Sequence, residues 1–127
     1  MPMLMSKNAL VVDDSHVLRT VARRIFEEME FEVAEAEDGM AALRAVRKKM
    51  PDIILFDGNL PSMKSVDLLK SVRGQQGGDR PVILVATTES DAEEIPHLMH
   101  AGANEYIMKP FDRVTVRAKL AEIGLTL

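Results

Sequence analysis

Ile53-Ile54-Leu55-Phe56-Asp57 is the most informative run of residues in the chain. Four apolar residues in succession indicate a strand that is covered on both faces, as in a parallel sheet, and the charged residue marks the point where the strand leaves the core. The same pattern recurs in Val11-Val12-Asp13-Asp14 and in Tyr106-Ile107-Met108-Lys109-Pro110. Because parallel α/β sheets bind ligands outside the carboxyl ends of their strands, we expect three carboxylates and one ammonium group to converge there.

Strand-like and helix-like stretches alternate along the chain. Short apolar or alternating runs predict strands at residues 9–12, 31–36, 52–56, 82–86 and 105–108. Apolar residues at helical spacing predict helices at residues 17–29, 41–46, 66–72, 91–101 and 112–123. This alternation predicts the α/β fold class, with an open, doubly wound parallel sheet of five strands and five helices.

Polar residues and prolines indicate where several helices begin and end. Ser15 or Asp14 can cap the first helix, and Asp38-Gly39 precedes the second. Pro96 falls inside the fourth predicted helix and can kink it, and Gly102 follows its last residue.

Length and composition limit the possible functions. The chain has 127 residues, enough for one domain, in which residues 1–7 are expected to form a short, mobile N-terminal segment. Its formal net charge of −4 gives no basic surface for nucleic acid or an anionic membrane, so neither is an expected partner. There is no cysteine and no apolar run of membrane-spanning length, and we expect a cytoplasmic protein.

Asp13-Asp14, Asp57, Thr87 and Lys109-Pro110-Phe111 together resemble the signature of two-component response-regulator receiver domains. The resemblance covers nearly the whole chain and is closest to the stand-alone receivers typified by the chemotaxis response regulator. It implies the flavodoxin-like strand order 2-1-3-4-5, which periodicity alone does not give.

The resemblance also implies a Mg²⁺ site. Asp14 and Asp57 would bind the ion directly, Asp13 directly or through water, and the backbone carbonyl of Asn59 would add a further oxygen. Elementary electrostatics agrees, because carboxylates a few ångströms apart repel each other by about 3 kcal/mol at an effective dielectric constant of about 20. A hard divalent cation would relieve that repulsion.

In the same family the phosphoryl group is carried by the acceptor aspartate, here Asp57, since a carboxylate can form an acyl phosphate. Lys109 would pair with Asp57 before phosphorylation and with the phosphoryl group afterwards, and the Lys109–Pro110 bond would be cis. Thr87 would donate its hydroxyl to the phosphoryl oxygens, and Tyr106 would swing inward behind it.

The implied partners are a histidine kinase or histidine phosphotransfer protein as phosphodonor and a downstream protein target. The target would bind the face formed by the fourth helix, fifth strand and fifth helix, in chemotaxis, motility or a phosphorelay. The chain would turn over no metabolite and would be a switch rather than an enzyme, a monomer or a weak phosphorylation-dependent dimer.

Three positions depart from the family pattern or leave it ambiguous. Lys64-Ser65 stands where the family commonly has Asp-Gly, so Ser65 must adopt the backbone conformation that the loop requires. Gly58 stands where a bulkier residue is frequent and should open the pocket. The residue whose hydroxyl would contact the phosphoryl oxygens is ambiguous by position. Counting from Pro81 gives Ala86, whereas counting back from Lys109 gives Thr87.

Other functions compete with the switch as interpretations of this sequence. A receiver fold that binds a protein partner without phosphorylation is the main alternative, and a Mg²⁺-dependent phosphohydrolase is a weaker one. A flavin mononucleotide protein would need a phosphate loop after the first strand, where Asp13-Asp14 would repel the phosphate. His97 and His100 have no third ligand spaced nearby, so no metal site is assigned to them.

Overall fold

The computed structural model describes residues 7–124 of the chain. The elements follow one another as β1 (Lys7–Val12), α1 (His16–Glu28), β2 (Phe31–Ala36), α2 (Gly39–Lys48), β3 (Ile53–Asp57), α3 (Ser65–Arg73), β4 (Val82–Thr87), the 3-10 helix η1 (Glu89–Glu94), α4 (Ile95–Ala101), β5 (Glu105–Met108) and α5 (Arg113–Glu122). The expected N-terminal segment, residues 1–7, lies outside the described residues except for Lys7, which is the first residue of β1.

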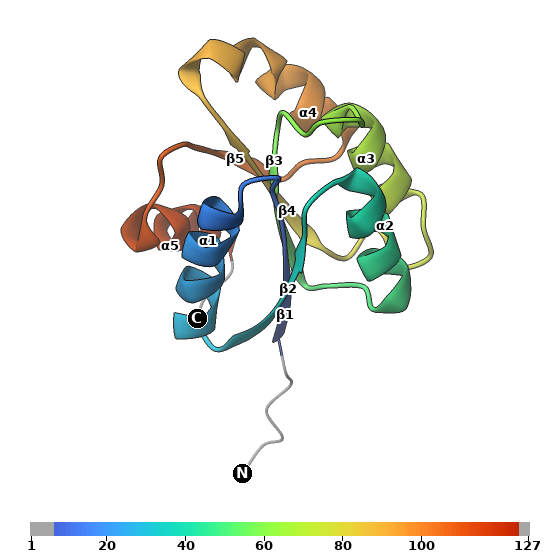
Figure 1. Cartoon of the computed structure of the whole chain (residues 1–127). Coiled ribbons are helices and arrows are strands. Elements are labelled where there is room, and N and C mark those ends of the chain that lie inside the picture. Colours follow the sequence, from blue (N-terminus) through green and yellow to red (C-terminus); the bar gives the residue numbers. More distant parts are fainter. Residues whose placement is uncertain (1–6, 125–127) are drawn as a thin grey trace.

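The five strands form one parallel sheet in the order β2-β1-β3-β4-β5, which confirms the predicted fold class and strand order. α1 and α5 cover one face of the sheet, and α2, α3 and α4 lie on the other (Figure 1). The chain builds outward from β1 to β2 and then continues on the other side of β1 with β3. In such a sheet this reversal creates a crevice at the carboxyl ends of β1 and β3.

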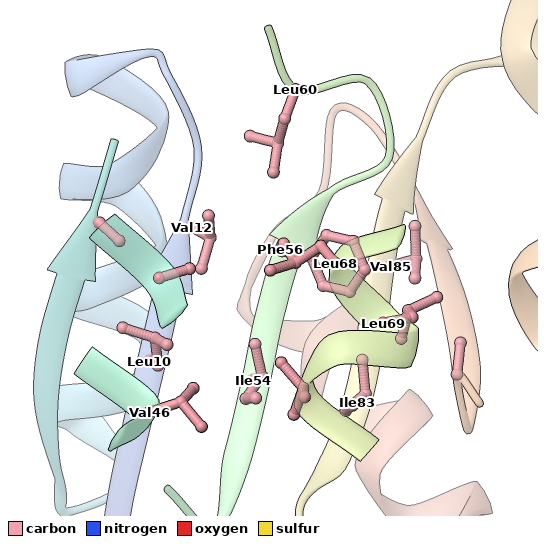
Figure 2. Close-up of a cluster of buried hydrophobic side chains, with 14 of the residues drawn as sticks. Leu10, Val12, Val46, Ile54, Phe56, Leu60, Leu68, Leu69, Ile83 and Val85 are labelled. Atoms are coloured by element: carbon pink, nitrogen blue, oxygen red, sulfur yellow. The ribbon is translucent and has the colours of Figure 1, made fainter. Parts of the chain in front are cut away.

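Each face of the sheet has its own hydrophobic core. Figure 2 shows the first, in which Leu10, Ile54 and Ile83 of the strands meet the leucines of α3. The second lies under α1 and α5, where Phe26 and Leu120 are fully buried against the opposite side of the same strands. Consecutive strand residues therefore belong to alternate cores, as the pleat of a sheet requires.

Side-chain caps stand at the start of three of the helices. The Ser15 hydroxyl accepts a hydrogen bond from the Leu18 N–H (3.2 Å), so Ser15 and not Asp14 caps α1. Asp38 caps α2 and Asp112 caps α5, each through a carboxylate oxygen that accepts a backbone N–H three residues later. Such caps satisfy N–H groups that have no partner within the helix.

The predicted continuous helix at residues 91–101 is wrong in its first part. Residues Glu89–Glu94 form the 3-10 helix η1, and the α-helix begins only at Ile95. Pro96 lies in the first turn of α4 and has no N–H to donate to the residue four positions earlier. An α-helix can therefore start at this proline but cannot run through it undisturbed.

Within residues 7–124, every helix falls short of the length and apolar character that a membrane-spanning helix needs.

Candidate functional site

The carboxyl ends of β1, β3 and β5 place three charged side chains on the same side of the sheet. Asp13 and Lys109 directly follow β1 and β5, and Asp57 is the last residue of β3. Each stands two residues beyond a buried side chain of the α1/α5 core, so the alternation along the strands turns all three toward that side. The expected convergence of charges is present.

Three carboxylates form a cluster at this edge. One oxygen from each of Asp13, Asp14 and Asp57 lies within 4.8 Å of the others. Asp13 is buried, Asp57 is half-buried and Asp14 is exposed, so the cluster opens to solvent at one side. Carboxylate oxygens are hard ligands, and this arrangement could hold a divalent cation.

The Lys109 ammonium group lies between two of these carboxylates. Its Nζ is 3.1 Å from Asp13 Oδ2 and 3.2 Å from Asp57 Oδ2. The pair with Asp57 is the one expected from the sequence, and the pair with Asp13 was not foreseen. The peptide bond from Lys109 to Pro110 is cis, as expected. One ammonium group faces three carboxylates, so the site carries excess negative charge.

Asp13 is held in place through both its side chain and its backbone. Its Oδ1 accepts a hydrogen bond from the Ser15 N–H (2.9 Å), and its backbone oxygen accepts one from Arg19 Nη1 (2.7 Å). Burial raises the pKa of the Asp13 carboxyl group, and the charge of Asp57 acts in the same direction, although Ser15 and Lys109 oppose the rise. A cation bound at the cluster would counter this cost of keeping Asp13 ionised.

The loop after β3 is supported by Ser65. The Ser65 hydroxyl donates a hydrogen bond to the Gly58 carbonyl oxygen (2.7 Å), and the Asn59 N–H donates to Asp57 Oδ1 (3.1 Å). The loop's left-handed residue is Ser62, with φ of 62°, whereas Ser65 is the first residue of α3. The Lys64-Ser65 departure therefore places no strained backbone at Ser65, and its buried hydroxyl supports the backbone next to Asp57. This role of Ser65 was not foreseen from the sequence.

A cleft of about 600 Å³ lies beside the carboxylate cluster, between this loop and α4. Gly58 and Asn59 line it next to Asp57, and the exposed Lys64 also contributes to its lining. A Cβ atom on Gly58 would lie 3.1 Å from Val85 Cγ1 and 3.3 Å from the Ala86 carbonyl oxygen. The glycine thus borders an open cleft on one side and tight packing on the other.

Thr87 is the last residue of β4 and is buried, with its hydroxyl 3.5 Å from the Thr88 carbonyl oxygen. Ala86 is the residue in register with Asp57, and Thr87 is in register with Met108. The Thr87 carbonyl oxygen accepts the Lys109 N–H (2.7 Å), which ties this strand end to the lysine. Thr87 is thus the hydroxyl-bearing residue at the site edge of β4.

Tyr106 is half-buried on β5, and its ring lies beneath the Lys119 ammonium group of α5. His97 and His100 are both exposed on α4, and the cluster of carboxylates described above does not include them.

Residues 9–121 match the model of the response regulator receiver domain family. The chemotaxis protein CheY-3 of Vibrio cholerae is 34% identical over 126 residues, which cover 97% of each chain. The chemotaxis protein CheY of Pseudomonas aeruginosa is 31% identical over 115 residues, 90% of this chain and 93% of that one.

Solved structures give the same result. The chemotaxis response regulator CheY4 of Vibrio cholerae superimposes with a TM-score of 0.86 at 31% identity, covering 94% of this chain and 99% of that one. The receiver domain of the sensor histidine kinase PA1611 from Pseudomonas aeruginosa, which holds a magnesium ion in its active-site cleft, gives 0.82 at 27% identity, covering 93% and 97%. The chain therefore belongs to the family of response regulator receiver domains and is similar to the CheY proteins of chemotaxis.

Proposed function

We propose that this receiver domain is a switch that is phosphorylated on Asp57 in a Mg²⁺-dependent reaction. The observation that carries the proposal is the Lys109 ammonium group, 3.2 Å from Asp57 Oδ2 within a cluster of three carboxylates. Asp57 is half-buried and reachable, and its Oδ2 faces the cation that would later pair with a phosphoryl group.

The side chains of Asp13, Asp14 and Asp57 would hold the Mg²⁺ ion, together with the backbone carbonyl of Asn59. Their hard oxygen donors fit the ion, and a bound cation would offset the burial that raises the pKa of the Asp13 carboxyl group. When bound, the ion would neutralise negative charge on the phosphoryl oxygens. The magnesium ion in the PA1611 receiver domain supports this assignment by similarity.

In the transfer step, a carboxylate oxygen of Asp57 attacks the phosphorus atom of a phosphohistidine on a histidine kinase or phosphotransfer protein. The new P–O bond forms as the P–N bond breaks, and the imidazole leaves with the electron pair of that bond and takes up a proton. Lys109 then pairs with the phosphoryl oxygens in place of the Asp57 carboxylate. Its ammonium group already contacts the acceptor carboxylate, at 3.2 Å from Asp57 Oδ2.

The phosphoryl group would be read through Thr87 and Tyr106. The Thr87 hydroxyl, now 3.5 Å from the neighbouring Thr88 carbonyl oxygen, has at most a long hydrogen bond to give up in turning toward the phosphoryl oxygens. Tyr106 would follow it inward and change the surface formed by α4, β5 and α5, where a downstream protein would bind. Similarity to CheY-3 favours a target in chemotaxis or motility over a phosphorelay.

A receiver that binds its partner without phosphorylation is the alternative. The departure from the family pattern at Lys64-Ser65 is what would support it, and the helical backbone of Ser65 and its hydrogen bond to Gly58 weaken that support. The carboxylate cluster and Lys109 favour the phosphorylated switch.

The proposal is tested by the intact mass of the protein after incubation with acetyl phosphate, with and without Mg²⁺. We expect the wild type to gain one phosphoryl mass only with Mg²⁺ and the Asp57→Asn variant to gain none. Asp67→Asn, which changes an exposed carboxylate on α3, is the matched control and should gain the same mass as the wild type. No adduct from acetyl phosphate or from a panel of phosphorylated histidine kinases would favour the alternative.

A further inference from the structure

Lys119 of α5 covers the ring of Tyr106 on β5. β5 is the last strand in the sheet order, so Tyr106 lies at an edge that α5 can reach. The Lys119 Nζ is 4.6 Å from the ring centroid. An ammonium group within about 6 Å of an aromatic centroid is attracted to the face of the ring. The lysine side chain is only 22% exposed, so this contact is partly shielded from water.

Two carboxylates flank the same ammonium group. The Lys119 Nζ is 3.7 Å from Glu105 Oε1 and 3.6 Å from Glu122 Oε2. Glu105 Oε1 also accepts a hydrogen bond from the backbone N–H of Tyr106 (3.0 Å). One carboxylate oxygen therefore contacts both the backbone of Tyr106 and the cation that lies over its ring.

A plain surface ion pair does not account for the position of Lys119. Both N–O distances exceed the range of a direct hydrogen bond, so neither carboxylate fixes the ammonium group by itself. Glu122 is also largely exposed, and exposed pairs of this kind contribute little. The ring face is the third contact of the ammonium group.

We propose that Lys119 is a positioning residue that holds the Tyr106 ring at the junction of β5 and α5. It opposes movement of the ring away from α5 and so favours the unphosphorylated arrangement. The inference rests on the proposed function in one step, the inward movement of Tyr106 after phosphorylation of Asp57. A cation–π contact at this exposure shifts a two-state equilibrium by about two- to five-fold.

The chain allows a direct test, because Tyr106 is its one tyrosine and it has no tryptophan. The tyrosine band of the near-ultraviolet circular dichroism spectrum therefore reports on Tyr106 alone. Lys119→Met keeps the aliphatic stem and removes the ammonium group, and we expect the band to lose intensity as the ring becomes more mobile. Lys119→Arg keeps a cation over the ring and should retain the band.

Arg117→Met is the matched control, since it removes one positive charge from an exposed position on the same helix. It should leave the tyrosine band unchanged. An unchanged band in Lys119→Met, or an equal loss in Arg117→Met, would overturn the inference.

The link to the switch is measured separately, by the fraction of protein phosphorylated at a limiting concentration of acetyl phosphate with Mg²⁺. Lys119→Met should need about two- to five-fold less acetyl phosphate than the wild type for half phosphorylation. If no variant forms the adduct but the tyrosine band still falls in Lys119→Met, the proposed function fails and the positioning role stands. If the wild type is phosphorylated and Lys119→Met matches it in both measurements, the inference alone fails.

Discussion

Arg73 and Lys109 are cationic side chains at opposite ends of the strands. Arg73 binds neutral oxygens, whereas Lys109 binds carboxylates. Arg73 lies at the edge where the strands begin, at the end of α3. Its guanidinium group donates to the backbone oxygens of Gly78, Pro81 and Gly102 and to the side-chain oxygen of Asn104, at 2.7 to 3.1 Å. All of these acceptors are neutral, so the guanidinium group has its hydrogen-bond partners without bringing negatively charged groups close to one another.

Lys109 lies at the edge where the strands end, and its partners are carboxylates. Asp13 and Asp57 compete for one ammonium group, and Asp14 adds a third negative charge beside them. The charge of Arg73 is shared among neutral dipoles, and its hydrogen bonds hold together the two loops before β4 and β5. In the Lys109 cluster, negative charge exceeds positive charge. This excess favours the binding of a cation, which phosphoryl transfer to Asp57 would need.

The largest expected effect is the loss of stability on removing Arg73. Arg73→Met leaves the carbonyl oxygens of three loop residues without their donor and should lower the free energy of unfolding by about 3 kcal/mol. Arg80→Met is the control, because the exposed Arg80 donates a single hydrogen bond to a loop carbonyl oxygen, that of Met50, at 2.9 Å. Its cost should stay below about 1 kcal/mol. Urea unfolding followed by circular dichroism measures both, and equal losses would contradict the assigned role of Arg73.

In the cluster around Lys109, removing a charged side chain should raise the free energy of unfolding and not lower it. Burial raises the pKa of the Asp13 carboxyl group above its ordinary value of 3.8, so the folded state binds this proton more tightly than the unfolded state does. The resulting stabilisation is complete below pH 3.8 and is lost as the pH rises through the raised pKa. In EDTA, Asp13→Asn should therefore be more stable than the wild type at neutral pH, by up to about 1 kcal/mol after solvent screening.

The same pair of proteins gives the control for metal binding. Millimolar Mg²⁺ should stabilise the wild type in proportion to its binding and should stabilise Asp13→Asn much less, because the variant has lost a carboxylate ligand. Thermal unfolding in EDTA and in Mg²⁺, repeated across the acid range, separates the two effects. If the variant is less stable than the wild type in EDTA at every pH, the interactions of Asp13 stabilise the fold on balance, as those of Arg73 do.

The sequence predicted much of the Lys109 edge, because each of its parts follows a strand directly. The apolar runs before Asp13, Asp57 and Lys109 fix where the strands end, and parallel strands end at one edge. The strand order came from the family resemblance, since periodicity carries no information about which strands are neighbours. The 3.1 Å contact between Lys109 and Asp13 could not be foreseen, because it depends on side-chain geometry beyond the strand ends.

The Arg73 edge was not predicted, for a physical reason. An arginine in the last turn of a helix has the same sequence pattern whether it faces solvent or a loop. Its acceptors come from two loops separated in sequence, before β4 and before β5, and are mostly backbone oxygens that every residue carries. The division of the fourth helix was foreseeable only as a possible kink at Pro96, because the sequence does not state which side of a proline stays α-helical.

The smallest expected effect concerns Ser65. Like Arg73, it donates a hydrogen bond to a neutral backbone oxygen, but it does so close to the carboxylate cluster around Lys109. Ser65→Ala removes the buried donor to the Gly58 carbonyl oxygen, and we expect the free energy of unfolding to fall by about 1 kcal/mol. Ser71→Ala on the exposed side of the same helix should change it by a few tenths at most. Because Gly58 directly follows Asp57, the Mg²⁺ affinity measured by titration should also fall in Ser65→Ala, by less than in Asp13→Asn. Loss of stability without any change in Mg²⁺ affinity would mean that the loop after β3 does not control the geometry of the carboxylate cluster. The neutral Ser65 hydrogen bond and the charged cluster would then act independently, although they lie side by side.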